Sequence, residues 1–534
     1  MKMSFTYLPT EILYLIEDYL HSASDLFSLI RTSRRFYDVL KSELYKKNVK
    51  SDGGSAIVWY ARQGNDVGVR GMLAAGADVN IRPLSRDQST ALIVAITHKH
   101  ATIVKTLLEN GAAPDAADLR SKRPLTLAAS ERSDPIITQL LLDHGAKPGA
   151  IASDKRAPLL EAILSNQESK AAMLLKYGAD AKLIEFRDRR NLLHVAAVKN
   201  ASPTLLGVLI KSGISVESRD FHGRTPLQAA VEHSCTRAVR VLLQHGADPN
   251  AKNERNGLSA LFCAACPKNS RSDNKTIIRT LVTYGAKVDA RGPGNQTALL
   301  YAISRGAKKQ AQELIEVGAS IHARNLDTES ILHLAASSFV VTPDIITWLV
   351  ENGADINWIG GKQHETPLFY AIARSKYSSP NVKSMASIML SLGSDANFRN
   401  IDGMTPLSFA ARQCSISLSE LLIQHGASVN SMDMQKKTPL HHVFDSKYES
   451  ASAKREMVSF LIRFGAAVNS RDANGYTPLH KAVATGWTWE IVGDLLNAGA
   501  DRCVMSDDGK FPYDMIPDGP WAETQRLILR HYPA

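Results

Sequence analysis

Residues 223–253 read GRTPLQAAVEHSCTRAVRVLLQHGADPNAKN, and most of the chain is a variation on this stretch. Thr225 suits the N-cap of a helix and Pro226 the first helical position, where a missing N–H does no harm. Apolar residues at 239–243 give a second short helix one packing face. Gly246 ends that helix, because glycine tolerates the left-handed conformation at the C′ position. The stretch therefore predicts two short helices and a turn, a unit that must stack on copies of itself to bury its apolar face.

Copies of this unit recur along the chain. The closing glycine appears thirteen times, at Gly76, Gly111, Gly145, Gly178, Gly213, Gly246, Gly285, Gly318, Gly353, Gly393, Gly426, Gly465 and Gly499. Most of these glycines lie 33 to 35 residues apart. The TPL element recurs in step with them, from Thr225, Thr366, Thr405, Thr438 and Thr477. This phasing indicates an array in which each repeat contacts only its neighbours.

The paired signatures resemble the ankyrin repeat. The resemblance implies an all-α dominated repeat solenoid of about thirteen ankyrin repeats, each a helix-turn-helix plus a β-hairpin loop. We expect the array to span residues 51–505 and a degenerate C-terminal capping repeat to span residues 506–534, where KFPY replaces TPLH. Three insertions, around residues 266–275, 375–383 and 444–456, are rich in Ser, Lys and Asn, so we expect solvated loops there. The alternative interpretation is that they contact a partner.

Residues 1–50 do not follow the repeat and predict three short helices. The first, which begins near Pro9, is apolar around most of its circumference, more than one packing face requires. A unit of about 40 residues rarely holds itself together alone. The surplus apolar surface indicates a binding partner.

The same residues resemble the F-box, through Leu8, Pro9, Glu11, Ile12, Ile16, Leu20, Asp25, Leu26, Leu29, Ser33, Arg34, Arg35 and Phe36. The resemblance implies a three-helix unit that docks onto a Skp-type adaptor within a cullin-RING ubiquitin ligase. The side chains that it would place against the adaptor are Leu8, Pro9, Ile12, Leu13, Ile16, Leu20, Leu26 and Leu29. The alternative interpretation is that these helices only cap the open end of the stack.

Composition and charge are those of an ordinary soluble protein, with 22% charged residues and a formal net charge of +10. The densest basic stretches are short, at residues 45–50 and 187–190, so we expect solvated charge and no direct nucleic-acid binding. No window approaches the roughly 18 apolar residues of a membrane span, and no signal peptide precedes the helices. Five cysteines make no disulfide framework. We expect no membrane association and a location in the cytoplasm, the nucleus or both.

Recurrent histidines and paired cysteines are the residues that most suggest chemistry. His194, His333 and their counterparts His441 and His480 occupy the fourth place of the TPLH element, where the ankyrin resemblance implies hydrogen bonds between units. The CxxC pair that begins at Cys263 has no second ligand pair nearby, so we expect it to be structural. Known catalytic and nucleotide-binding motifs are lacking, and the carboxylates are scattered. We therefore predict no catalytic, cofactor-binding or metal site and no enzymatic activity of its own.

With no catalytic site expected, the remaining function is protein binding, and the candidate binding residues lie at the hairpin tips. In ankyrin arrays these tips and the inner helices form a concave surface, and the fold does not need apolar side chains at the tips. The candidates are Phe221, His222, Leu326, Trp358, Ile359, Ile401, Met432 and Met434. An exposed aromatic or methionine side chain at such a position is either a local packing accident or an anchor for a partner protein.

Two hypotheses follow. In the first, the protein is a substrate receptor of an SCF-type ligase: the F-box holds the Skp-type adaptor and cullin, and the concave face of the array holds an unidentified protein substrate. In the second, it is a non-catalytic ankyrin scaffold or transcriptional co-regulator without ligase function. In both we expect a monomer within a hetero-complex.

Overall fold

The computed structural model describes residues 34–531 except for ten short segments, which are 84–87, 131–133, 151–156, 185–187, 267–273, 339–341, 374–381, 447–448, 485–488 and 520–521. The chain divides into two compact units, residues 1–255 and 256–534, and each is described by itself. The adaptor-facing residues expected between Leu8 and Leu29 lie outside the described residues.

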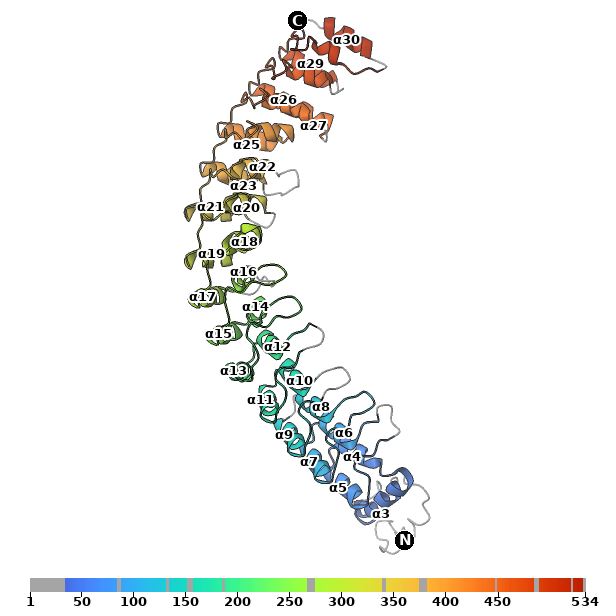
Figure 1. Ribbon diagram of the computed structural model, residues 1–534. Coiled ribbons are helices and arrows are strands. Elements are labelled where there is room, and N and C mark those ends of the chain that lie inside the picture. Colours follow the sequence, from blue (N-terminus) through green and yellow to red (C-terminus); the bar gives the residue numbers. More distant parts are fainter. Residues whose placement is uncertain are drawn as a thin grey trace. The chain divides into compact units, whose positions relative to one another are not determined.

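The described part of the first unit consists of one long helix followed by helix pairs. Its helices are α3 (Arg34–Asp52), α4 (Ala56–Gln63), α5 (Asp66–Ala74), α6 (Ala91–Thr97), α7 (Ala101–Glu109), α8 (Pro124–Ser130), α9 (Pro135–Asp143), α10 (Pro158–Leu164), α11 (Glu168–Lys176), α12 (Leu192–Val198), α13 (Pro203–Lys211), α14 (Pro226–Glu232) and α15 (Thr236–Gln244). From α4 onward the first helices of the pairs lie side by side in one row and the second helices in another (Figure 1).

The second unit repeats the plan. Its helices are α16 (Ala260–Ala265), α17 (Lys275–Thr283), η2 (Pro293–Asn295), α18 (Ala298–Ser304), α19 (Lys308–Glu316), α20 (Ile331–Ser337), α21 (Pro343–Glu351), α22 (Pro367–Ala373), α23 (Val382–Ser391), α24 (Pro406–Arg412), α25 (Ile416–Gln424), α26 (Pro439–Asp445), α27 (Ala451–Arg463), α28 (Pro478–Ala484), α29 (Trp489–Asn497), η4 (Pro512–Met515) and α30 (Ala522–His531). The short 3₁₀ helix η4 takes the place of a first helix and packs against α28 and α30.

The repeat at residues 223–253 folds as its sequence predicts. Thr225 is the N-cap of α14 and forms a capping box with Gln228, while Pro226 occupies the first helical turn. At the end of α15, Gly246 has φ +84° and the N–H of Ala247 donates to the carbonyl of Leu242 at 3.0 Å. This is the Schellman arrangement that a C′ glycine permits. All thirteen closing glycines have positive φ, between 82° and 96°.

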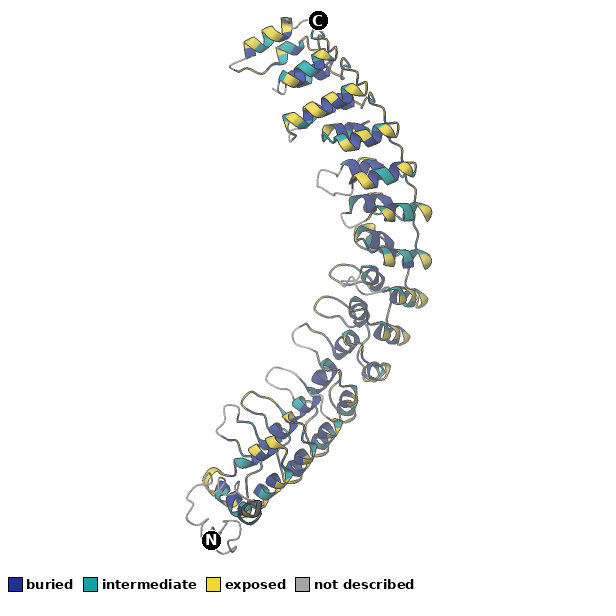
Figure 2. Ribbon diagram, turned by 180° about the vertical axis from the view of Figure 1, so that it is seen from behind, coloured by how far each residue is buried: buried dark blue, intermediate teal, exposed yellow. Residues whose placement is uncertain are grey.

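The two helices of a repeat differ in burial. Six consecutive residues of α14, from Pro226 to Val231, are buried, so this helix is packed on all sides. In α15 the buried residues follow a helical stripe, and Arg237 and Arg240 are exposed. Figure 2 shows the same contrast between buried and exposed residues along both rows of helices. The second helices are therefore the amphipathic outer layer.

The loops between repeats are tight hairpins. The described residues contain no strand, only isolated bridges at Ile184–Asn191 and Gly360–Glu365. One or two backbone bonds close the described hairpins after a few residues, as from the N–H of Asp220 to the carbonyl of Arg224 at 3.0 Å, while Gly360 and Glu365 exchange two bonds. So few pairs cannot extend into a ladder, and the described hairpins are turns with one or two closing bonds.

Helix α3 packs directly against the first repeat. Leu40, Leu44 and Tyr45 are buried, and the Tyr45 ring meets the ring of Tyr60 edge to face at 5.8 Å. A Cβ added to Gly71 of α5 would lie 2.1 Å from the Tyr45 ring, so glycine is required for this approach. The helix thus covers the open end of the stack, as the capping interpretation expects of it.

The insertion at residues 444–456 differs from expectation. Residues from Ala451 are helical and lengthen α27 to 13 residues, where most second helices have nine. Ser450 caps the added turn by accepting the N–H of Ala453, and Lys454 is fully buried and donates to the carbonyl of Ser446. A polar composition indicated a solvated loop, but the N-cap and the buried lysine make an additional helical turn.

Candidate functional site

The hairpins of the second unit, called fingers here, share one backbone pattern. In each finger the N–H of one residue closes the hairpin, and this residue is Gly292, Asn325, Gly360, Asn400, Asp433, Asp472 or Ser506. The residue before it is called the stem residue, and the stem residues are Arg291, Arg324, Ile359, Arg399, Met432, Arg471 and Met505. The residue after it is called the tip residue, and the tip residues are Pro293, Leu326, Gly361, Ile401, Met434, Ala473 and Asp507. In the Gly360 finger the N–H of Glu365 adds a second bond back to Gly360.

Backbone hydrogen bonds join successive fingers. The N–H of Leu326 donates to Gly294 at 3.0 Å, that of Ile401 to Gln363 at 3.1 Å and that of Met434 to Asp402 at 3.0 Å. Gly361, Ala473 and Asp507 bond to their preceding fingers in the same way. The tips of the second unit therefore form one continuous row, with fixed neighbours for each side chain.

Six finger residues expose large apolar side chains and are called the finger strip. The tip residues Leu326, Ile401 and Met434 are 74%, 47% and 76% exposed. The stem residues Ile359, Met432 and Met505 are 49%, 41% and 52% exposed. Single exposed apolar residues are normal on a protein surface, but exposed apolar residues that recur on adjacent fingers indicate contact with another protein.

Five strip residues were expected from sequence, and Met505 was missed. Its finger precedes the eroded KFPY element, so it did not stand beside a TPL signature. Its place in the repeat frame, equivalent to Met432, was the signal that could have found it.

The Trp358 side chain makes contacts within the array and is not freely exposed to a partner. Its indole N–H donates to the carbonyl of Thr328 at 3.1 Å, and the Arg324 guanidinium lies 3.3 Å above the ring centroid. The side chain is half-buried. This tryptophan secures its finger against the preceding one.

Phe221 and His222 lie in the first unit. Both are exposed, with ring centroids 5.6 Å apart. The Arg255 guanidinium covers Phe221 at 4.3 Å, a cation–π contact. They make a separate candidate patch on that unit.

Stem arginines fix the spacing of the fingers. Arg399 donates to the carbonyl of Met432 at 2.8 Å, and Arg471 donates to the carbonyl of Met505 at 3.1 Å. Arg291 makes the same bond to Arg324, and in the first unit Arg219 bonds Lys252. Each bond links one stem to the next, so the backbone that carries the strip residues is held in place.

A buried charge cluster holds the finger that carries Met432 and Met434. His442 of α26 bonds Asp433 of the finger at 3.0 Å and Asp445 at 3.1 Å, and Lys437 meets Asp445 at 3.0 Å. Burial lowers the pKa of His442, but the two carboxylates outweigh it and the net shift is upward. Burial raises the pKa of Asp445, while His442 and Lys437 lower it to about 2. An ion-paired imidazolium therefore ties the finger to the helix.

The recurrent histidines are structural. In each of the four repeats Nε2 bonds the carbonyl of the next repeat, as from His194 to Arg224 at 2.9 Å and from His480 to Lys510 at 3.2 Å. His333 and His441 bond Glu365 and Tyr476 in the same way. The inter-repeat role expected of them is confirmed.

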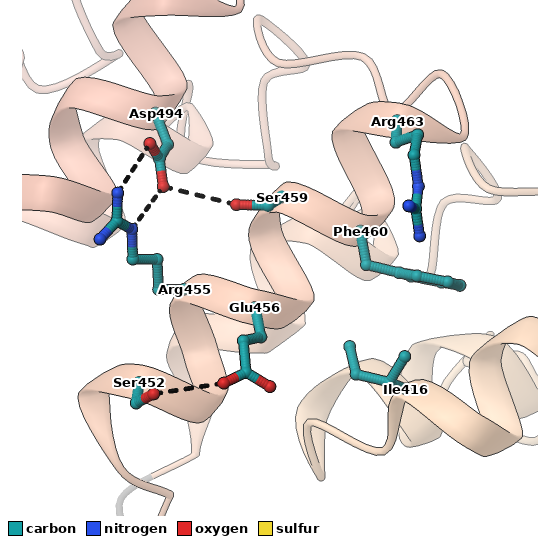
Figure 3. A pocket seen from close by; sticks show the side chains of 8 residues that line it. All are labelled: Ile416, Ser452, Arg455, Glu456, Ser459, Phe460, Arg463 and Asp494. Atoms are coloured by element: carbon teal, nitrogen blue, oxygen red, sulfur yellow. Dashed lines mark hydrogen bonds and ion pairs between the residues drawn. The ribbon is translucent and has the colours of Figure 1, made fainter.

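A cavity of about 670 Å³ opens on the outer helices at α27 (Figure 3). Phe460 and Ile416 form its apolar part. Arg455 meets Asp494 at 2.8 Å, and that carboxylate also accepts from Ser459 (Figure 3). Ser452 also bonds Glu456, so most of the polar groups drawn there bond one another, while the Arg463 guanidinium lies over the Phe460 ring. Among the described residues, the finger strip is the better candidate for binding a partner, because it exposes large apolar side chains on adjacent fingers.

Comparison with known proteins agrees with this geometry. The profile described as ankyrin repeats (3 copies) matches residues 32–118, 178–253 and 376–452, and the single ankyrin-repeat profile matches residues 474–507. An F-box-like profile matches residues 5–51. The chain is an ankyrin-repeat protein with an N-terminal F-box-like domain.

Several curated proteins are similar to this ankyrin-repeat protein over part of its length. The B-cell lymphoma 3 protein homolog of Mus musculus is 28% identical over 191 residues, 35% of this chain and 41% of the relative. The E3 ubiquitin-protein ligase KEG of Arabidopsis thaliana is 22% identical over 56% of this chain and 19% of its own length. Ankyrin repeat and SOCS box protein 6 of Homo sapiens is 27% identical over 44% of this chain and 60% of its own length. The chain thus spans less than two thirds of each relative.

The solved human ASB11 ankyrin repeat domain aligns at 24% identity with 43% of this chain and 98% of that one, at a TM-score of 0.36. F-box and ankyrin modules are non-catalytic interaction modules, and this protein combines both. Within the described residues, no helix has the length and apolarity needed to cross a membrane.

Proposed function

We propose that this ankyrin-repeat protein is a substrate receptor of an SCF-type cullin-RING ubiquitin ligase. The F-box-like domain binds a Skp-type adaptor through the apolar residues between Leu8 and Leu29. The ankyrin array binds the protein to be ubiquitinated. The observation that carries the proposal is an F-box-like match at residues 5–51 that runs directly into a repeat array with exposed apolar fingers.

The mechanism is positional. Binding both adaptor and target on one chain raises the effective concentration of a target lysine near the ubiquitin-charged partner. Helix α3 belongs to the residues that the F-box-like profile matches and also packs on the first repeat. A helix shared by both modules supports the proposal, because it leaves no flexible linker between α3 and the array to dilute this concentration.

The test is to replace Leu8 and Pro9 by Ala in the full-length chain. We expect the Skp-type adaptor to be lost on co-purification and the lifetime of the array's bound target to increase. The control is Leu8→Met, which keeps an apolar side chain of similar volume and should retain the adaptor. Adaptor binding that survives the double substitution would refute the F-box assignment.

A scaffold or transcriptional co-regulator without ligase function is the second candidate. The observation that favours it is that α3 has a structural task of its own, because its buried Leu40 and Tyr45 cover the first repeat. In that case the Leu8 and Pro9 substitutions leave both target binding and target lifetime unchanged. The same experiment therefore separates the two functions.

A further inference from the structure

We propose that the finger strip, with the stem arginines between its residues, binds an acidic segment of a partner polypeptide that carries large apolar side chains. This inference rests on the proposed role of the array as the target-binding module. It adds the chemistry of the segment that the array recognises.

The stem positions alternate between cationic and apolar side chains. Along successive fingers they are Arg324, Ile359, Arg399, Met432, Arg471 and Met505. The backbone pattern places one such residue on each finger, and the tips Leu326, Ile401 and Met434 lie two residues further along the same hairpins. A ligand that follows the row therefore meets positive and apolar groups in turn.

The fold does not require the apolar side chains. At the equivalent positions 219 and 291 the array has arginine, which clamps the next finger. The carbonyls of Met432 and Met505 are held by the preceding arginines whatever their own side chains are. Ile359, Met432 and Met505 are left half-exposed with no structural bond to make, so their apolar surface is available to a partner.

Two stem arginines lie close to a carboxylate at the tip of the following finger. Arg471 meets Asp507, the tip residue of the following finger, at 2.8 Å. In the first unit Arg219 lies 3.9 Å from Glu254, which occupies the equivalent tip. A carboxylate at the next tip is thus the repeat's own partner for a stem arginine.

Two stem arginines beside strip residues have no acidic residue at the next tip. The tip after Arg399 is Met434, and the tip after Arg324 is Gly361. Among the described residues neither arginine has a carboxylate partner, although Arg399 bonds one carbonyl and Arg324 stacks on Trp358. Two guanidinium groups with donors to spare, each beside exposed apolar side chains, fit carboxylates supplied by another chain.

A polypeptide fits the strip better than a nucleic acid does. Phosphate binding needs cations close together along a backbone, whereas here methionine, isoleucine and leucine separate them. Methionine adapts its shape to different apolar partners, so it suits a peptide-binding surface. Nucleic-acid binding is therefore a competing outcome that the experiment must identify.

The test uses the full-length protein and a displayed library of random peptides at physiological salt. We expect the selected peptides to be enriched in Asp and Glu together with Leu, Ile, Met or Phe. The most enriched peptide is then titrated by fluorescence anisotropy, together with versions in which its acids become Lys or its apolar residues become Ser. Both changes should weaken binding at least about tenfold, which corresponds to ~1.4 kcal/mol.

The decisive variant is Met434→Asp. It places at the tip after Arg399 the acid that Asp507 supplies after Arg471, so the arginine is paired within the chain while its clamp to Met432 is kept. We expect at least about a tenfold loss of peptide affinity with unchanged thermal stability. Arg324→Glu combined with Arg399→Glu should abolish binding. Arg237→Glu with Arg240→Glu, on exposed positions of α15, is the matched control and should have no effect.

Selection without an acidic and apolar bias, or full affinity in Met434→Asp, overturns the inference. An oligonucleotide that displaces the peptide equally well from the wild type and from Met434→Asp would show a nucleic-acid site instead. None of these results affects adaptor co-purification, which depends on Leu8 and Pro9. Failure of this inference is thereby distinguished from failure of the proposed function.

Discussion

A few residue types perform the same task in repeat after repeat. The closing glycines reverse the chain, and the TPLH histidines bond one repeat to the next. Both tasks depend on local geometry, so each residue's effect can be tested singly.

The first prediction at this scale concerns Gly246. Replacing it with Val should lower the free energy of unfolding of its repeat by roughly 1–2 kcal/mol, because an L-residue with a Cβ is strained in the left-handed region. A Cβ there would meet nothing within 4 Å, so the loss comes from the backbone alone. Hydrogen exchange of α15 measures it, and Gly246→Asn should cost less. Equal protection in Val and wild type would show that this glycine is not a helix stop.

The second prediction concerns two adjacent histidines with opposite pH responses. Burial lowers the pKa of His441 to about 4, so the unfolded chain takes up a proton first as pH falls below ~6.5, and stability is lost between these values. The carboxylates raise the pKa of His442, so its contribution is present below ~6.5 and is lost as pH rises through the raised value.

Hydrogen exchange of the finger around Met434 across the neutral range checks the second sign. Protection should fall as pH rises in the wild type beyond the intrinsic pH effect on exchange. His442→Lys should remove that fall, because lysine side chains do not titrate in the neutral range and a lysine fits this position: Lys481, at the equivalent position of the next repeat, meets Asp472 at 3.1 Å. An unchanged pH profile in this variant would show that the imidazolium does not hold the finger.

At the scale of elements, α3 and the fingers make contacts that an isolated repeat cannot make: α3 covers the first repeat, and each finger bonds its neighbour. Helix α3 closes the stack through Leu40, Leu44 and Tyr45. The fingers lie edge to edge, and a Cβ at Gly403, where φ is +76°, would come 2.8 Å from the backbone nitrogen of Met434. Close approach of backbones thus fixes the positions of the strip side chains.

The prediction for α3 is that Leu40→Ala destabilises the first repeat by about 2–5 kcal/mol, because a fully buried leucine leaves a cavity. Hydrogen exchange in α4 and α5 of the full-length protein measures the effect. Ser42→Ala, at an exposed position of the same helix, is the control. If α4 kept its protection in Leu40→Ala, the helix would be an appendage of the array and not its cap.

At the scale of the whole molecule, stability is distributed, because each helix pair packs on the pairs before and after it within its unit. The protein can therefore lose order at one repeat while a distant repeat keeps its binding surface. This independence suits the proposed function, in which the adaptor and the target bind different segments of the chain.

The corresponding prediction is that Leu242→Ala, at a fully buried position of α15, loosens α12 to α15 while leaving the fingers from Leu326 to Met505 protected. Nearest-neighbour coupling is the physical reason. Hydrogen exchange with mass spectrometry resolves the two regions in one experiment. Uniform loss of protection along the chain would mean a single cooperative unit, contrary to a repeat array.

The sequence by itself determined the phase of the repeats, the helix caps and the closing glycines, and the ankyrin resemblance implied the role of the histidines. The caps and glycines depend on residues within one turn of helix, and the phase depends on one repeat length, so local chemistry suffices for them. It also singled out five of the six strip residues, since hairpin tips follow from the repeat frame. The F-box resemblance was equally local, and its profile match confirms it at residues 5–51.

Only the tertiary structure decided which of these residues act together. The bond that holds Trp358, the additional turn of α27 and the pairing of Arg471 with Asp507 all join atoms from different repeats or from an inserted segment. Such contacts depend on how closely neighbouring backbones approach, and one-dimensional spacing does not encode that distance. Arg471 has a carboxylate partner, whereas Arg324 and Arg399 have none among the described residues, and from this difference the partner's acidic character is inferred. It therefore became visible only once the fingers of the second unit were placed side by side.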